Sequence, residues 1–312
     1  MEIDYDLVII GGGAAGMAAA QYGARANLKT LLVEEMAVGG QALLIDALEN
    51  YPGVKGPVSG YDLSETMRVQ AEAFGSSFLT ATVSALRKEG EGLFRLETSE
   101  GPLSAKALVL ATGAKHRHVG VPGEEEFAGR GVSYCATCDG PFFKGKRMLV
   151  VGGGDAACDE SAYLAKLSDR IVVAHRRDRF RAQASLAART LSNPSIDVRF
   201  NTLVERIQGS KKVESVTLKN IAEGRSYEEG VDAVFVFVGS IPQTALAEGA
   251  RKDEGGYLVT DEHMQTSLPG LFAAGDVRAS SFRQLVTAAS DGAIAAHSAS
   301  RYIDELKGAA YA

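Results

Sequence analysis

The sequence predicts an α/β protein of two three-layer domains, one of them inserted into the other. The chain has 312 residues, 46% of them hydrophobic, which is enough to bury a core in each of two domains. A pattern of strand, glycine turn, helix and second strand begins near Tyr5 and returns 141 residues later. A buried-strand pattern at residues 271–274 and a long helix to about Leu306 follow the second copy, and they complete the first domain.

The first copy reads as a strand at residues 7–10, a glycine turn, an alanine-rich helix at about 14–27 and a second strand at 30–33. In such a turn the first glycine permits a tight bend, the second lets the backbone approach a pyrophosphate, and the third lets the helix pack on the strand. The helix N-terminus then offers free N–H groups to the phosphates. Both copies therefore predict Rossmann-like, dinucleotide-binding units. The residues at these three positions are Gly11, Gly13 and Gly16 in the first copy, and Gly152, Gly154 and Ala157 in the second.

The residues that follow the second strand of each copy indicate which nucleotide it binds. In the first copy, Glu34 can accept hydrogen bonds from ribose hydroxyls and would repel a ribose phosphate, which suits FAD or NAD. The second copy carries basic residues there, which can bind a 2′-phosphate through charge-assisted hydrogen bonds and suit NADPH. A solvated basic surface is the alternative. The basic residues are His175, Arg176, Arg177 and Arg181, with Arg179 as the weakest member.

Further turns and helix starts in the first domain could contact a flavin nucleotide. Asp276 follows the strand at residues 271–274 and could accept a hydrogen bond from a ribitol hydroxyl. The N-terminus of the last helix, near Gln284, could stabilise negative charge on a reduced flavin ring. From the residues alone, Asp276 is equally well a turn residue and Gln284 a first-turn helix residue. The complete set is Gly40, Gln41, Thr112, Gly113, Asp276, Arg283 and Gln284.

The order of these elements predicts a discontinuous first domain at residues 1–116 and 246–312, with residues 117–245 inserted as the second domain. The chain would cross between them near residues 115–119 and 243–247. β-branched runs at 198–208 and 213–219 and an apolar strand at 231–238 belong to the second domain, and a meander at about 81–103 belongs to the first. Each domain should therefore carry a small added β layer.

Composition excludes several classes of protein. The net charge of −6 leaves no basic surface of the kind that binds nucleic acid. The N-terminus lacks the pattern of a signal peptide, and no apolar run approaches the roughly 20 residues that cross a bilayer, so the cytoplasm is expected. With three cysteines in the chain, a disulfide scaffold is excluded. A close cysteine pair in a cytosolic protein is more often catalytic or metal-binding than structural.

Such a pair lies just before the second glycine turn, at Cys135 and Cys138, and Asp139 follows it. Two cysteines separated by two residues at a helix start can form a disulfide, and the helix end lowers the thiolate pKa of the more exposed one. In thiol–disulfide exchange, such a thiolate attacks a disulfide, and the thiolate that leaves must receive a proton. Asp139 could handle the proton if burial raised its pKa, and helix capping is the alternative.

A zinc site is the main competitor for this pair. His116 and His118 lie upstream and would complete a set of two cysteines and two histidines. The two histidines are only two positions apart, whereas zinc ligands of this kind prefer three to five intervening residues. We therefore expect no metal. Cys158, one turn past the second glycine turn, is most simply a small buried residue without an inferred role.

Over essentially its whole length, the chain resembles the low-molecular-weight, bacterial-type thioredoxin reductases. The string Cys-Ala-Thr-Cys-Asp between two nucleotide turns is the specific part. Larger glutathione reductase relatives carry their disulfide near the position of residues 39–41, where this chain has no cysteine. The other matching stretches are Gly11-Gly-Gly-Ala-Ala-Gly16, Gly39-Gly40-Gln41, Ala111-Thr112-Gly113, Gly152-Gly-Gly-Asp-Ala-Ala157, His175-Arg-Arg-Asp-Arg-Phe-Arg181, Gly275-Asp276 and Arg283-Gln284.

The resemblance implies a homodimer with FAD in the discontinuous domain and NADPH in the inserted domain, where Asp155 and Ala156 join the NADPH-binding residues. It implies that NADPH reduces FAD and that FAD reduces the Cys135–Cys138 disulfide through Cys138. Cys135 then attacks the disulfide of thioredoxin, with Asp139 as proton donor and acceptor. Because the nicotinamide and the cysteine pair must meet the flavin in turn, the inserted domain would rotate between the two steps.

The resemblance also implies that thioredoxin docks near Arg130, Phe142 and Phe143. Family members often have an aromatic residue at the position of Pro141, so docking here could differ in detail. Three alternatives remain from the sequence. One is the flavoprotein of a peroxide-reducing system, which would need an extra N-terminal redox domain. Another is a ferredoxin-dependent flavin enzyme, against which the arginine cluster argues. The third is a non-catalytic zinc or nucleotide sensor, which would be colourless when purified.

Overall fold

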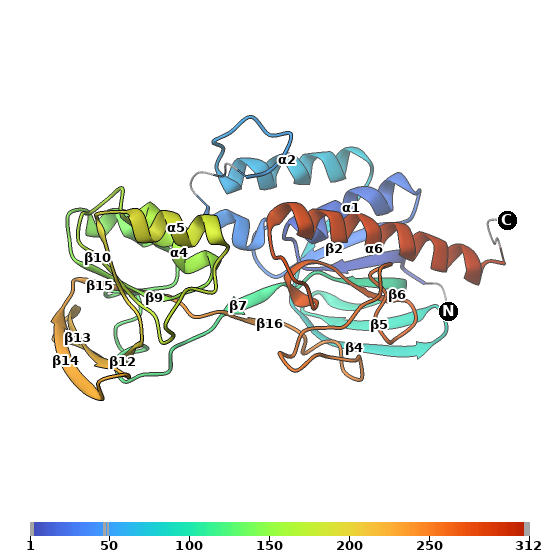
Figure 1. The fold of residues 1–312 in the computed structure, drawn as a ribbon. Coiled ribbons are helices and arrows are strands. Elements are labelled where there is room, and N and C mark those ends of the chain that lie inside the picture. Colours follow the sequence, from blue (N-terminus) through green and yellow to red (C-terminus); the bar gives the residue numbers. More distant parts are fainter. Residues whose placement is uncertain (1–2, 46–47, 49, 309–312) are drawn as a thin grey trace. The chain divides into compact units, whose positions relative to one another are not determined.

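The computed structural model describes residues 3–45, 48 and 50–308 (Figure 1). The chain forms two compact units, one made of Met1–Lys115 and Ile241–Ala312 and the other of His116–Ser240. Both passages of the chain between the units run through a two-stranded sheet of β7 (Ala114–His116) and β16 (Ser240–Pro242). The predicted fold class, α/β with one dinucleotide-binding type of unit inserted into another, is confirmed.

The first unit is built on a seven-stranded sheet in the order β3-β2-β1-β6-β5-β4, with β17 also paired to β6. Strands β1, β2, β3, β6 and β17 run parallel, and β4, β5 and the start of β6 form the predicted meander. The strand bounds are Tyr5–Ile10 (β1), Thr30–Glu34 (β2), Ser77–Thr80 (β3), Val83–Gly90 (β4), Leu93–Thr98 (β5), Gly101–Leu110 (β6) and Leu271–Ala273 (β17).

Alternate residues of β1 face the two sides of the sheet, as its buried apolar run requires. Leu7 and Ile9 pack in a core with α1 (Ala14–Arg25), α2 (Gly60–Ala73) and α6 (Leu285–Leu306). Val8 and Ile10 pack in a second core with the meander and with residues that precede and follow β17. Figure 1 shows these helices on one side of the parallel strands and the meander strands β4 and β5 on the other side, which gives the three layers.

Helix α6 packs on α1 at a position where only glycine fits. A Cβ on Gly292 would lie 2.0 Å from the carbonyl oxygen of Ala15, well inside contact distance. Gln284 caps α6 through a reciprocal pair of hydrogen bonds with Thr287. The N-terminus of α6 is therefore fixed beside the N-terminus of α1.

The second unit repeats this plan around the sheet β11-β10-β9-β15-β8. Helices α4 and α5 cover one face, where Val150 and Phe235 are buried, and a three-stranded sheet, β12-β13-β14, covers the other. The strands are Val132–Ser133 (β8), Met148–Gly152 (β9), Ile171–Ala174 (β10), Ile196–Arg199 (β11), Thr202–Gly209 (β12), Val213–Asn220 (β13), Arg225–Gly230 (β14) and Ala233–Phe237 (β15). The helices are Ala136–Asp139 (α3), Asp155–Leu164 (α4) and Ala184–Ser192 (α5).

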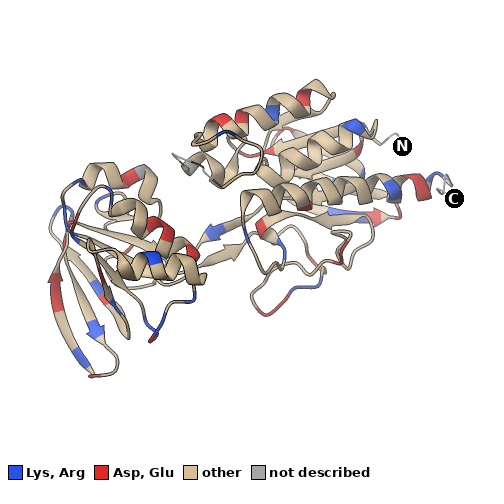
Figure 2. Cartoon of the chain, turned by 45° about the horizontal axis from the view of Figure 1, so that its top comes forward, with Lys and Arg blue, Asp and Glu red and all other residues tan. Residues whose placement is uncertain are grey.

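The internal repeat is real in three dimensions, since α4 begins 141 positions after α1 and β10 begins 141 positions after β2. One expected run is divided, however. Residues 198–208 form parts of two strands in different sheets, because Asn201 adopts a left-handed conformation (φ 50°) that turns the chain between β11 and β12. In Figure 2, acidic and basic residues are interspersed over both units.

Candidate functional site

The first glycine turn, between β1 and α1, is closed toward the protein and open on its other side. Gly11 has φ +106°, and a Cβ there would lie 2.4 Å from the carbonyl oxygen of Ala111. A Cβ on Gly16 would lie 1.8 Å from the carbonyl oxygen of Gly11. A Cβ on Gly13, by contrast, would meet nothing within 4 Å. The turn therefore forms a cradle at the N-terminus of α1, whose first N–H groups no side chain caps.

Glu34 lies at the end of β2, beside this cradle. One carboxylate oxygen accepts a hydrogen bond of 2.6 Å from the amide of Gly12, and the other accepts one of 3.2 Å from the amide of Met36. Each oxygen keeps a further lone pair, so the carboxylate can still accept from ribose hydroxyls. This is the position that sequence reasoning assigned to the adenosine ribose.

A second turn, at Gly40 and Gln41, is tied to the first. Gly39 donates its amide to the carbonyl oxygen of Gly12 at 2.7 Å, and a Cβ on Gly40 would lie 3.2 Å from Gly13 Cα. The side-chain amide of Gln41 donates a hydrogen bond to the carbonyl oxygen of Ala114. Gly40 therefore lines the same cradle, while Gln41 reaches the start of β7.

Thr112 and Gly113, which follow β6, are held by Gln243. The Thr112 hydroxyl donates to the Gln243 carbonyl oxygen at 2.7 Å, and the Gln243 side chain donates to the Thr112 carbonyl oxygen at 2.6 Å. The Gln243 amide also donates to Gly113. Sequence reasoning placed Gln243 only at a crossing between the domains and did not foresee these hydrogen bonds, because Thr112 is 131 positions away and no local pattern signals the pairing.

Asp276 and Arg283 present polar groups that the protein itself does not satisfy. Burial raises the pKa of Asp276, and the nearby Arg283 cation opposes that rise. Among the residues that the structure describes, no group hydrogen-bonds the Asp276 carboxyl. The Arg283 Nε atom is buried without a partner, and its guanidinium stacks 4.1 Å from the ring centroid of Tyr257. Gln284 accepts a hydrogen bond of 2.9 Å from Asn50.

These observations fit a bound FAD. The open cradle at Gly13 suits a pyrophosphate, the carboxylate at Glu34 suits a ribose, and the unsatisfied groups at Asp276 and Arg283 suit a polar ligand near the start of α6. Tyr257, which positions Arg283, was not found from the sequence because it lies in a loop without regular periodicity.

The second glycine turn, between β9 and α4, has the same one-sided form. A Cβ on Gly152 would lie 2.3 Å from the carbonyl oxygen of Phe237, whereas one on Gly154 would meet nothing within 4 Å. The ring of His175 packs on this turn, since a Cβ on Gly153 would lie 2.3 Å from its Nδ1 atom. The turn is therefore open only where a phosphate would enter.

His175 differs from the arginines that follow it. Its side chain is buried between Phe180 and Phe200, and its Nε2 atom has no partner among the described groups. Burial lowers the pKa of His175, a hydrogen bond to the backbone of Arg179 opposes this shift, and the neighbouring arginine charges add to the lowering. It is therefore a neutral packing residue beside the turn, with one free ring nitrogen.

The arginines themselves are exposed. No described side chain or backbone group accepts a hydrogen bond from the guanidinium groups of Arg176, Arg177, Arg179 or Arg181. The amide of Arg181 donates to the carbonyl oxygen of Gly153 at 2.7 Å, which ties the cluster to the glycine turn. Free guanidinium groups fixed beside a phosphate cradle fit the 2′-phosphate of NADPH.

Asp155 and Ala156 begin α4 next to this cradle. The Asp155 carboxylate accepts hydrogen bonds from the Gln183 amide at 2.8 Å and from the Gln183 side chain at 2.9 Å. Asp155 therefore holds the segment before α5 against the start of α4. Ala156 is exposed at the first turn of the helix.

The cysteine pair lies at the start of a helix, as expected, and this helix, α3, is a single turn. Cys135 is half-buried and disulfide-bonded, and the side chain of Cys138 lies outside the described residues. Cys135 Sγ lies 3.4 Å from the Thr137 hydroxyl, and the amide of Cys135 donates to the Ser133 hydroxyl at 3.1 Å. The Asp139 side chain makes no helix-capping hydrogen bond, so the capping alternative has no support.

Among the described residues, which leave out the side chain of Cys138, no three potential metal ligands converge. His118 Nδ1 instead lies 2.7 Å from the Tyr134 hydroxyl, which donates to the buried Glu124 at 2.9 Å. His116 stacks on the Tyr134 ring, with centroids 6.3 Å apart. Cys158 is a buried free thiol whose pKa is raised by burial, as expected for a residue that only packs.

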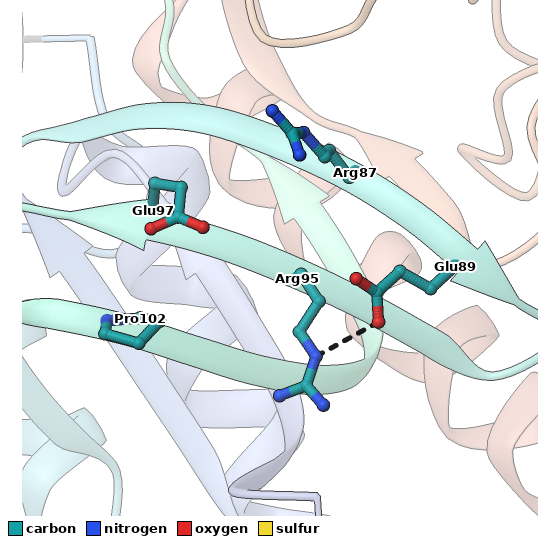
Figure 3. A pocket seen from close by; sticks show the side chains of 5 residues that line it. All are labelled: Arg87, Glu89, Arg95, Glu97 and Pro102. Atoms are coloured by element: carbon teal, nitrogen blue, oxygen red, sulfur yellow. Dashed lines mark hydrogen bonds and ion pairs between the residues drawn. The ribbon is translucent and has the colours of Figure 1, made fainter.

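A hollow of about 390 Å³ lies on the meander of the first unit (Figure 3). Its lining is mainly charged, and Arg95 forms an ion pair of 3.1 Å with Glu89. Arg87 and Arg95 lie opposite each other on β4 and β5, and the carboxylates of Glu89 and Glu97 lie in the same hollow. The hollow therefore carries charges of both signs and favours neither an anionic nor a cationic ligand. It is lined by Arg87, Glu89, Arg95, Glu97 and Pro102.

The chain is similar to known proteins along nearly its whole length. Residues 5–292 match the family described as pyridine nucleotide-disulphide oxidoreductase. A thioredoxin reductase of Treponema pallidum (strain Nichols) is 56% identical over 98% of this chain and 100% of its own length. A helix long and apolar enough to cross a membrane is not found among the described residues.

Two solved structures extend this similarity to three dimensions. The thioredoxin reductase of Lactococcus lactis (FR conformation) is 40% identical with a TM-score of 0.92, and the match covers 97% of this chain and 100% of that one. The thioredoxin reductase of T. acidophilum is 34% identical with a TM-score of 0.89, covering 98% and 100%. The chain therefore belongs to the pyridine nucleotide-disulphide oxidoreductase family and is an oxidoreductase.

Proposed function

We propose that this protein is an NADPH-dependent thioredoxin reductase. The observation that carries the proposal is the disulfide-bonded Cys135 in the same unit as a phosphate cradle with free arginines, while the other unit holds a flavin-type cradle. Such a chain contains a site for an electron donor, a site for an electron carrier and a disulfide to be reduced.

The chemistry divides between the cofactors and the chain. When bound, NADPH supplies a hydride and FAD passes an electron pair to the disulfide of Cys135 and Cys138. Cys135 then attacks, as a thiolate, one sulfur of the thioredoxin disulfide and forms a mixed disulfide. The thiolate of Cys138 attacks Cys135 and releases the second thioredoxin sulfur, so that two electrons and two protons pass to thioredoxin. Asp139 donates and accepts the proton at the departing sulfur.

Residues of the two cradles hold the cofactors in this proposal. Gly11, Gly13 and Gly16 with Glu34 bind the adenosine diphosphate part of FAD. Arg176, Arg177 and Arg181 bind the 2′-phosphate, which a ferredoxin-dependent enzyme would not need. The inserted unit turns on β7 and β16, the two strands that carry both crossings.

Thioredoxin docks near Arg130, Phe142 and Phe143 in this proposal. Phe142 is 81% exposed, which is unusual for a large apolar side chain and suits an interface. Phe143 instead packs edge-on against Phe235, 6.2 Å between centroids, so it supports the segment rather than offering surface. We further propose a homodimer that acts in the cytoplasm.

The deciding experiment is an anaerobic titration with NADPH and then with oxidised thioredoxin, followed by flavin absorbance. The wild-type flavin bleaches and then recovers. The flavin of the Cys138→Ser variant should bleach with NADPH, but the variant should fail to reduce thioredoxin, because the sulfur that we propose exchanges electrons with the flavin is gone. Thioredoxin reduction by the Cys138→Ser variant, or a colourless wild-type protein, would overturn the proposal.

A further inference from the structure

Glu160, on α4, carries a buried carboxyl that the proposed mechanism does not use. Its Oε2 atom is inaccessible to water and has no hydrogen-bond partner. Buried carboxyl oxygens are normally paired, so an unpaired one calls for a physical explanation. Burial, with a smaller contribution from Asp159, raises the pKa of Glu160 to about 7.

The geometry of α4 places Glu160 beside α3 and the preceding Cys135, which we call the cysteine turn. Helix α4 packs against α3, and a Cβ on Gly140, directly after α3, would lie 2.8 Å from the Leu164 side chain and 3.5 Å from that of Tyr163. Glu160 precedes Tyr163 and Leu164 by three and four positions. Residues with this spacing share one face of a helix, so Glu160 lies on the face that meets the cysteine turn.

Few other charged groups lie on the elements that pack around Glu160. Asp159, the neighbour of Glu160, forms an ion pair of 2.9 Å with Arg189 of α5, and Asp155 is held by Gln183. Strands β9, β10 and β15, which also pack against α4, contain no titratable residue. On α3 the titratable groups are Cys138 and Asp139. The remaining titratable groups of α4 are Cys158 and Tyr163.

We propose that Glu160 is a positioning residue that controls how readily the reduced cysteine turn forms a thiolate. When its carboxyl is protonated, the turn faces a neutral group and the thiolate forms freely. When it is ionised, a second negative charge lies nearby in a water-poor environment and opposes the thiolate. The inference rests on the proposed function, because only a dithiol that exchanges with another disulfide needs such control.

The test is alkylation of the reduced protein by iodoacetamide, measured against pH in a Cys158→Ala background. In the parent protein, the thiolate reactivity should rise with pH in a broadened curve, because Glu160 ionises over the same range. Glu160→Gln should give one simple titration and about three- to tenfold faster alkylation where Glu160 would be ionised. Glu160→Asp keeps the charge and should keep the broadened curve.

Two further measurements keep the inference separate from the proposed function. Glu223→Gln, an exposed carboxylate between β13 and β14, should leave the alkylation curve unchanged. Identical curves for the parent and Glu160→Gln, with both variants folded by circular dichroism, would overturn the role of Glu160. Failure of the wild-type protein to reduce thioredoxin would overturn the proposed function instead, and the alkylation curves would be unaffected.

Discussion

Gly16 approaches Gly11 so closely that a Cβ on Gly16 would lie 1.8 Å from the Gly11 carbonyl oxygen. The obstacle is backbone rather than the end of a side chain, so the turn would have to open to admit even one methyl group. We expect Gly16→Ala to lower the free energy of unfolding by about 1–3 kcal/mol or more. The variant should also fail to retain FAD. The ratio of flavin to protein absorbance after purification measures the second effect.

Gly13→Ala is the matched control for this turn. A Cβ on Gly13 would meet no protein atom within 4 Å, and the residue has an extended conformation that alanine adopts. The apoprotein should therefore unfold at the wild-type temperature. FAD should nevertheless bind more weakly, because the methyl group would occupy the space that we assign to the pyrophosphate. Unchanged FAD affinity in Gly13→Ala would place the pyrophosphate elsewhere.

The free arginines of the second unit predict a change in coenzyme preference. Arg176→Ala and Arg181→Ala should each raise the KM for NADPH about tenfold or more, because a charge-assisted hydrogen bond contributes about 1.5–3 kcal/mol. The KM for NADH should hardly change, since NADH lacks the 2′-phosphate. Steady-state kinetics with both coenzymes measures the ratio.

Arg225→Ala, on the exposed strand β14, controls for the loss of one positive charge. An equal loss of affinity for NADPH and NADH in the Arg176 or Arg181 variants would contradict the assignment of these residues to the 2′-phosphate.

The sequence predicts the fold well because both repeats combine a local glycine pattern with a buried strand. It predicts the open faces of the two cradles for the same reason. Local patterns do not reveal burial in the tertiary structure, and His175 therefore looks like part of a basic cluster although it packs between Phe180 and Phe200. Nor do they reveal pairings at long range, such as that of Gln243 with Thr112.

The two adjacent phenylalanines after α3 should differ in effect. Phe142→Ala should raise the KM for thioredoxin by about tenfold or more, because an exposed aromatic ring at the centre of an interface contributes about 2 kcal/mol. Bleaching of the flavin by NADPH should remain at the wild-type rate. Phe143→Ala should instead lower the unfolding temperature, since its ring packs on Phe235. An unchanged KM for thioredoxin in a folded Phe142→Ala variant would move the docking surface away from this segment.

Two buried groups of the second unit, His175 and Glu160, should make the stability of the protein change with pH in opposite directions. The pKa of His175 is lowered in the folded protein, so the unfolded chain binds its proton first, and stability is lost as the pH falls below about 6.5. The pKa of Glu160 is raised to about 7, so the folded protein binds its proton first. The stabilisation that Glu160 contributes is complete below its unfolded pKa of about 4.3 and is lost as the pH rises through 7, at most about 4 kcal/mol in all.

Single variants separate the two contributions. Between pH 7.5 and pH 5, Glu160→Gln should lose more stability than the wild-type protein on acidification, because the contribution of Glu160 no longer opposes that of His175. His175→Gln should lose less stability than the wild-type protein over the same range, or gain it, because the contribution of His175 is removed. Urea unfolding at several pH values, followed by circular dichroism, measures both slopes. Parallel pH dependence in the wild-type protein and both variants would mean that neither group titrates as its burial requires, and the electrostatic account of α4 would fail with it.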